Sequence, residues 1–96
     1  MKIITDKNQA LIEVRQDGFA LRYASEELRN DREVVLAAVE QDGQALKYAS
    51  DELQNDKEVV MEGIRTTNGW ALLYAGKELK NEIRQIMQDN LIIYLK

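Results

Sequence analysis

Residues 17–35 read DGFALRYASEELRNDREVV, and residues 42–60 repeat that stretch as DGQALKYASDELQNDKEVV. A third, shorter copy, NGWALLYAGKELKNEI, occupies residues 68–83. The first two copies lie 25 residues apart, and the third is shifted by one further residue near Thr66 and Thr67. Repetition at a fixed period of this length indicates a protein built from stacked structural units.

The repeat predicts an all-α fold, in which three long helices alternate with short ones. We expect a short α-solenoid, because each unit is too small to bury its apolar face alone. The chain is predicted to form a single domain over residues 1–96. Its parts are unit 1 (about residues 6–30), unit 2 (31–55), unit 3 (56–81) and a closing helix at 82–96 that covers the end of the stack.

Each long helix is predicted to begin after an aspartate, because a carboxylate in that position caps free amide groups and faces the positive end of the helix dipole. Each is predicted to end at a glycine, which adopts left-handed backbone at no steric cost. The capping residues are Asp6, Asp31 and Asp56, the glycines are Gly18, Gly43 and Gly69, and the helices span about 7–16, 32–41 and 57–67.

The shorter part of each unit is predicted to be helical over about 19–24, 44–49 and 70–75, since its alanines and leucine recur on one helical face. Ser25 and Ser50 then resemble caps for further short turns at 26–29 and 51–54. Serine is also tolerated inside helices, so an uninterrupted helix over 19–29 is the alternative.

The two ends of the stack differ in polarity. The first long helix has Gln9 and Glu13 where the middle helix has Val34 and Ala38, which is the polar outer face expected of a terminal unit. In the third helix the small Gly63 would let neighbouring helices approach closely. The closing helix has apolar residues at helical spacing, namely Ile83, Ile86, Met87, Leu91 and Tyr94.

The composition argues against an enzyme. The 96 residues include no histidine and no cysteine, which removes the most common general base and the thiolate nucleophiles and metal ligands. No motif predicts a cofactor, a calcium loop or a phosphate-binding loop. The longest apolar run, 34–39, is far too short to span a membrane, and the first residues are too short and polar for a signal peptide. We therefore expect a cytoplasmic protein.

Two sets of repeated polar side chains suggest chemistry only weakly. Tyr23, Tyr48 and Tyr74 could line a binding face, but we expect their rings in the core and their hydroxyl groups bonded to a nearby Glu or Asn. The repeated carboxylates could hold a cation, but equivalent residues of a solenoid lie a whole unit apart. We expect them instead to face a helix dipole in its first turn or to bond a neighbouring backbone amide; they are Glu27, Glu52 and Glu78.

Nucleic acid is not an expected partner. The net charge is −4, and the basic residues do not align between the copies: Arg15 corresponds to Glu40, and Arg29 to Gln54. Repeat proteins that read nucleic acids place reading side chains at the same position of each unit and add basic residues for the phosphates.

The string D-G-x-A-L-x-Y-A-S-x-E-L-x-N-D-x-E-V-V, at 17–35 and 42–60, resembles a tandem repeat of many bacterial and some protist and viral proteins that is known only as a domain of unknown function. The resemblance covers roughly residues 6–83 and implies an all-helical repeat, often within a longer array. It brings no catalytic residue, cofactor or substrate. The third copy departs from the pattern at Asn68, Gly76 and Glu82, as a structurally relaxed terminal copy would.

The position after each repeat glycine varies between the copies and holds Phe19, Gln44 or Trp70. Varied large residues at equivalent surface positions are where a repeat scaffold specifies its partner. The alternative is that the two aromatic residues fill gaps at the ends of a short stack. The sequence therefore predicts a non-catalytic module for protein–protein interaction or scaffolding within a larger protein. A regulatory or substrate-docking segment attached to an enzyme is the alternative.

Overall fold

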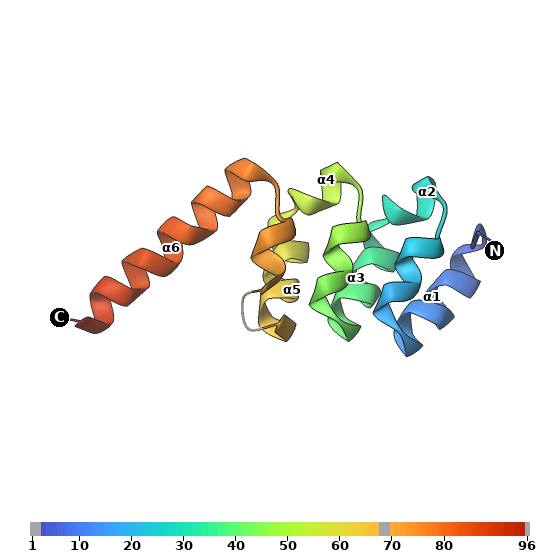
Figure 1. Ribbon diagram of the computed structural model, residues 1–96, viewed down its shortest axis with the longest axis horizontal. Coiled ribbons are helices and arrows are strands. Elements are labelled where there is room, and N and C mark those ends of the chain that lie inside the picture. Colours follow the sequence, from blue (N-terminus) through green and yellow to red (C-terminus); the bar gives the residue numbers. More distant parts are fainter. Residues whose placement is uncertain (1–2, 68–69, 96) are drawn as a thin grey trace.

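The computed structural model describes residues 3–67 and 70–95, without the side chains of 70, 87 and 89–95. The fold is all-α (Figure 1). Ten- and eleven-residue α-helices alternate with short 3-10 helices, here labelled η, and with single α-turns. The elements are α1 (Lys7–Gln16), η1 (Gly18–Tyr23), α2 (Glu26–Arg29), α3 (Arg32–Gln41), η2 (Gly43–Tyr48), α4 (Asp51–Gln54), α5 (Lys57–Thr67), η3 (Trp70–Tyr74) and α6 (Lys77–Leu95).

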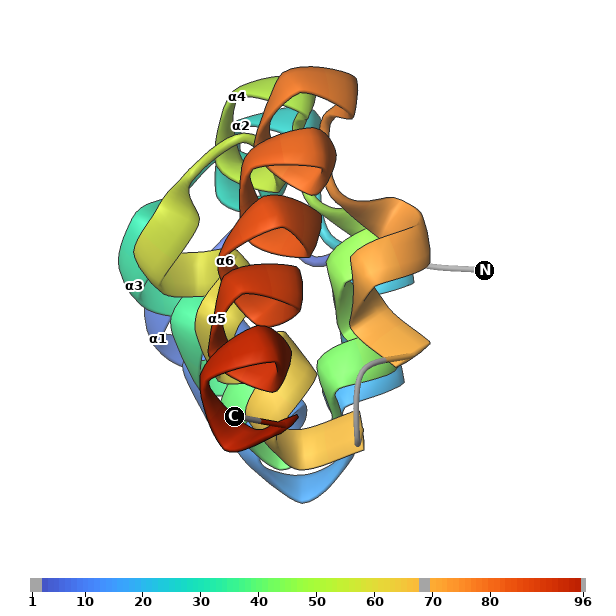
Figure 2. The same cartoon turned by 90° about the vertical axis from the view of Figure 1, so that its left-hand side faces the viewer.

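Equivalent elements of successive units lie side by side in two layers. The long helices α1, α3 and α5 pack in that order in one layer, and η1, η2 and η3 pack in the same order in the other. Figure 2 shows the two layers edge-on, with α2 and α4 along one edge. Each unit therefore contributes one long α-helix to the first layer and one 3-10 helix to the second. The Cα atoms extend over 53 × 23 × 19 Å.

The bounds of the three long helices confirm the sequence prediction, because the aspartate caps form as expected. The carboxylate of Asp6 accepts a hydrogen bond from the amide of Gln9 at 3.1 Å. Asp31 accepts from two amides of the first turn of α3, and Asp56 accepts from the amide of Val59 at 3.2 Å.

The shorter elements are 3-10 helices. Among the described residues, η1 and η2 begin and end one residue earlier than predicted, whereas η3 begins at Trp70 as predicted and ends one residue earlier. Ala24, with φ −78° and ψ 153°, and Ala49 are extended, so the backbone breaks after each tyrosine. The hydroxyl of Ser25 then accepts from the amide of Leu28 at 3.3 Å and starts a new turn. The alternative of an uninterrupted helix over 19–29 is therefore wrong, and the two predicted short turns are confirmed.

The reason predicted for the repeat glycines is wrong at the two positions that the structure describes. Gly18 and Gly43 do not adopt left-handed backbone. Instead, a Cβ atom on Gly18 would lie 2.6 Å from the carbonyl oxygen of Ala38, and one on Gly43 would lie 2.2 Å from that of Gly63. Glycine is required because the backbone of the next long helix occupies the space of a side chain. Gly69 lies outside the described residues.

The core runs through all three units between the two layers. Leu21 and Leu46 are completely buried, and Leu72 is half-buried against the same cluster. At the first end of the stack Gln9 is exposed and Glu13 half-buried, which matches the polar outer face predicted there. One apolar cluster therefore connects the units.

A recurrent backbone hydrogen bond also joins each short turn to the preceding unit or to the segment before α1. The amide of Ser25 donates to the carbonyl of Ile4 at 2.9 Å, and the amide of Ser50 donates to that of Arg29 at 3.0 Å. The amide of Gly76 makes the corresponding bond to Gln54 at 2.9 Å. The same linkage thus survives the change from serine to glycine in the third copy.

The C-terminal helix differs from the prediction. A separate closing helix over 82–96 was expected to cover the stack, but α6 begins at Lys77 and leads away from α5 (Figure 1). Its contribution to the core comes from Leu79 and Ile83, whereas Ile86 is 39% exposed. Met61 at the end of the stack stays 43% exposed. The physical reason is Glu82, which replaces the capping aspartate: glutamate is a good helix former and a poor N-cap, so the helix continues.

Candidate partner-binding face

The residues predicted to bind a partner all belong to the layer of 3-10 helices. Phe19 is the second residue of η1 and is half-buried, and Gln44 is the second residue of η2 and is exposed. Trp70 is the first residue of η3, but its side chain lies outside the described residues. The equivalent positions therefore share one layer of the fold.

Phe19 connects two units. Its ring meets that of Tyr48 edge to face, with the ring centroids 6.2 Å apart and an interplanar angle of 84°. Edge-to-face pairs contribute beyond the burial of their area. Phe19 therefore stabilises the contact between η1 and η2, and it is half-buried.

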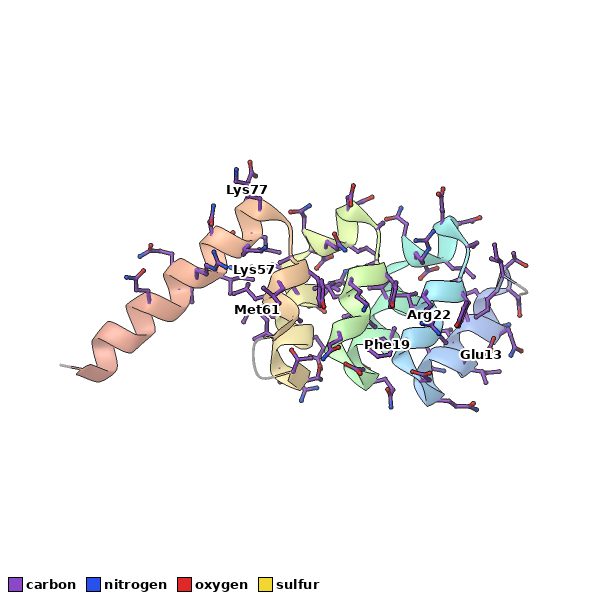
Figure 3. The ribbon with its side chains drawn as sticks, viewed as in Figure 1. Glu13, Phe19, Arg22, Lys57, Met61 and Lys77 are labelled. Carbon is purple, nitrogen blue, oxygen red and sulfur yellow. The ribbon has the colours of Figure 1, made fainter. Side chains whose placement is uncertain are left out.

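Two cations cover these rings. The ammonium of Lys47 lies 5.6 Å from the centroid of Phe19 and 5.1 Å from that of Tyr48. The guanidinium carbon of Arg22 lies 4.5 Å from the centroid of Tyr23. Arg22 and Phe19 both project from η1 (Figure 3). We call these five residues the aromatic–cation cluster.

The predicted environment of the tyrosines is only partly correct. Tyr23, Tyr48 and Tyr74 are half-buried and pack against the core. The hydroxyl of Tyr23, however, accepts a hydrogen bond from Arg22 and not from a Glu or Asn side chain. That bond, followed by a weaker contribution from Tyr48, raises the pKa of Arg22 above its ordinary value.

A second row of basic residues, missed in the sequence, joins the units on the side of the long helices. The Nζ atom of Lys7 lies 3.0 Å from Oδ2 of Asp31, and Nε of Arg32 lies 2.8 Å from Oδ2 of Asp56. The Nζ atom of Lys57 lies 3.1 Å from Oε1 of Glu82. These bases repeat every 25 residues. The expectation that no basic residue aligns between copies is therefore wrong. The signal was a base directly after each capping aspartate.

The paired charges shift each other's pKa. The hydrogen bond from Arg32 is the largest influence on Asp56 and holds the pKa of that carboxyl below its ordinary value. Burial raises the pKa of Asp31, but the hydrogen bond from Lys7 and the amides of α3 outweigh it, and the net shift is downward. The capping aspartates of units 2 and 3, Asp31 and Asp56, thus stay ionised to a lower pH than a free aspartate does.

The repeated glutamates do not converge. Glu27, Glu52 and Glu78 are all exposed, and the described residues contain no group of three acidic, histidine or cysteine side chains that could hold a metal ion. A shallow groove of about 610 Å³ separates α2 from α4. Carboxylates and an arginine line it, among them Glu26, Glu27, Arg29, Asp51 and Glu52.

Among the described residues, no helix is both long enough and apolar enough to cross a membrane.

One protein family matches the chain twice, over residues 6–54 and 31–80. The two matches are displaced by one repeat, as expected for a chain whose units are equivalent. No curated protein and no solved structure matches this chain. Together the two matches cover residues 6–80, well over half of the sequence, and the chain belongs to the family described as a domain of unknown function, DUF4116.

Proposed function

We propose that this chain is a non-catalytic, cytoplasmic α-solenoid module of a larger protein, and that it binds a protein partner through the face formed by η1, η2 and η3. The observation that carries the proposal is the aromatic–cation cluster. Its rings are half-buried, and its two cations are exposed and contact no carboxylate among the described ion pairs. Partly exposed aromatic rings and arginine are the residues most often responsible for affinity at protein interfaces.

The layer of long helices is a weaker candidate for the same role. Its repeated bases, Lys7, Arg32 and Lys57, are engaged by carboxylates of the following segment, as in the pair of Arg32 with Asp56 and Glu58. Charges that are already neutralised within the chain give a partner little to recognise.

The alternative role, a regulatory or substrate-docking segment of an enzyme, would use the same face of η1–η3 and differ in what the rest of the protein does.

A pair of photo-crosslinking variants tests the assignment. Benzoylphenylalanine is placed at Gln44 on η2 in one variant and at Glu40 on α3 in the other; both positions are exposed. Irradiation in cells of the native host, followed by mass spectrometry, should give a protein adduct from position 44 that the unlabelled domain competes away. The same adduct should be absent from position 40. Equal adducts at both positions, or none at position 44, would contradict the proposal.

A further inference from the structure

The basic residues of the two layers differ in what neutralises them. Lys7, Arg32 and Lys57 each contact a carboxylate of the following segment. Arg22 and Lys47 occupy equivalent positions of units 1 and 2, and neither contacts a carboxylate in the described part of the chain. Two positive charges therefore remain uncompensated on the outer side of the layer of 3-10 helices, in a chain whose net charge is −4.

The rings beneath hold these cations in place. Tyr23 lies under Arg22, while Phe19 and Tyr48 lie under Lys47, at centroid distances between 4.5 and 5.6 Å. A ring attracts the cation through its π face and leaves outward N–H groups of the cation available as donors. Because an ordered cation loses less conformational entropy on binding, the stacked arrangement favours capture of an anionic group.

The third unit changes the chemistry of the same position. Leu73 replaces the cation there, and its side chain is 55% exposed. The position thus reads arginine, lysine, leucine along η1, η2 and η3, which pack side by side. Packed helices lie about 8–10 Å apart. A polyproline II segment advances about 3 Å per residue and has about three residues per turn, so every third side chain of such a ligand would face the same way and match adjacent units.

We propose that the partner presents an acidic segment in the polyproline II conformation, in which two carboxylates three residues apart bind Arg22 and Lys47 and an apolar side chain three residues further on covers Leu73. This inference rests on the proposed function and specifies the chemistry of its partner. Charge complementarity identifies the ligand: uncompensated cations take carboxylates, and the exposed leucine takes an apolar group.

Single-stranded nucleic acid would use similar residue types but fits the geometry less well. Bases bind by stacking on open aromatic faces, whereas Lys47 and Arg22 already lie over the faces of these rings. Two cations also provide few phosphate contacts, and a negative net charge repels a polyanion. The carboxylate ligand therefore agrees better with the structure.

A binding titration tests the spacing and the charge. A fluorescein-labelled peptide carries two aspartates three residues apart and a leucine three residues beyond, with glycine and serine between them, and anisotropy reports its binding. The R22Q/K47Q variant should raise Kd by about tenfold, and more salt should weaken binding to the native chain. The R15Q/R84Q variant removes the same charge from exposed positions on α1 and α6 and should leave Kd within about twofold.

Exchanging the charges gives the decisive comparison. R22E/K47E should lose the aspartate peptide and gain the matching lysine peptide, while circular dichroism and the urea midpoint show that it remains folded. No binding of the aspartate peptide, an equal loss in R15Q/R84Q, or tighter binding of a labelled oligothymidine would overturn the acidic ligand. An adduct at position 44 alone would still support the interface, so the two proposals can fail separately.

Discussion

Two rows of basic residues follow the same 25-residue repeat on opposite layers of the fold, and they are used differently. In the long-helix layer, Lys7, Arg32 and Lys57 reach the carboxylates of the next segment and join the units. In the layer of 3-10 helices, Arg22 and Lys47 lie on aromatic rings. Repetition alone thus does not distinguish a structural charge from one available to a partner; the contacts of each charge do.

Both rows depend on one core, so the largest expected effect is the loss of that core. Leu46 is completely buried in the central unit, between the two layers. Leu46→Ala should lower the free energy of unfolding by about 2–5 kcal/mol, because it removes buried methyl groups and leaves a cavity. Urea denaturation measures the loss. The matched control Leu73→Ala, at a position that is 55% exposed, should change stability by less than about 0.5 kcal/mol. A loss below about 1 kcal/mol for Leu46→Ala would contradict the shared core.

A close backbone contact at Gly43 limits how near the neighbouring units can approach. A methyl group on Gly43 would lie 2.2 Å from the carbonyl oxygen of Gly63, which belongs to backbone and cannot rotate away. Gly43→Ala should therefore destabilise the protein by about 1–3 kcal/mol, as overpacking does. An Ala variant of Gly76, whose nearest neighbour is the movable carboxamide of Asn55, should be milder in the same urea assay. Similar losses in both variants would show that the backbone contact is not decisive.

A smaller effect is expected from a single link of the paired row. Asp56 both caps α5 and accepts from Arg32. Asp56→Ala removes the cap and the pair and should cost about 1 kcal/mol, mainly through the cap. Asp56→Asn keeps a capping oxygen but loses the negative charge, so it should recover most of that stability. If the Asn variant were as unstable as the Ala variant, the ion pair would contribute more than the cap.

What the sequence predicted well was local. The aspartate caps and the serine turns depend on residues within three positions of each other, and these boundaries agree with the structure. The 3-10 geometry was not predicted, because the same alanines and leucine satisfy either helix type. The true role of Gly18 was not predicted either, since the atom that excludes a side chain, the carbonyl oxygen of Ala38, is distant in sequence.

The contacts of the candidate face were not predicted. The variable position drew attention to Phe19, but the contacts of Phe19 with Tyr48 and Lys47 cross from one unit to the next. Contacts between units are invisible when copies are compared position by position. The paired row, in contrast, could have been found, because Lys7 and Arg32 directly follow the capping aspartates.

Acid should weaken the paired row in a defined direction. In the folded state the pKa of Asp31 and of Asp56 lies below the ordinary value of 3.8, so the unfolded chain takes up these protons first. The stability that they contribute is therefore fully present above about pH 4 and decreases as the pH falls through the folded-state pKa values. Urea midpoints of the native chain should fall across this range. The fall should be smaller than the decrease that the Asp56→Ala substitution causes at neutral pH. The D31N/D56N variant should show a flatter acid dependence, and an unchanged slope would assign the effect to other carboxyls.

The smallest expected effect separates the two rows most directly. Lys47→Gln and Lys57→Gln remove the same charge from the two layers, and Arg22→Gln and Arg32→Gln form a second matched pair. Substitution of Lys57 or Arg32 should lower the urea midpoint slightly, and added salt should shrink the difference, because each loses a carboxylate partner. Substitution of Lys47 or Arg22 loses a cation–ring contact and no carboxylate partner, so its effect on the midpoint should also be small and should change little with added salt, while the rings remain packed on the core. If all four variants were equally destabilised and equally sensitive to salt, both rows would be structural, and the cations over η1 and η2 would no longer support a partner-binding face.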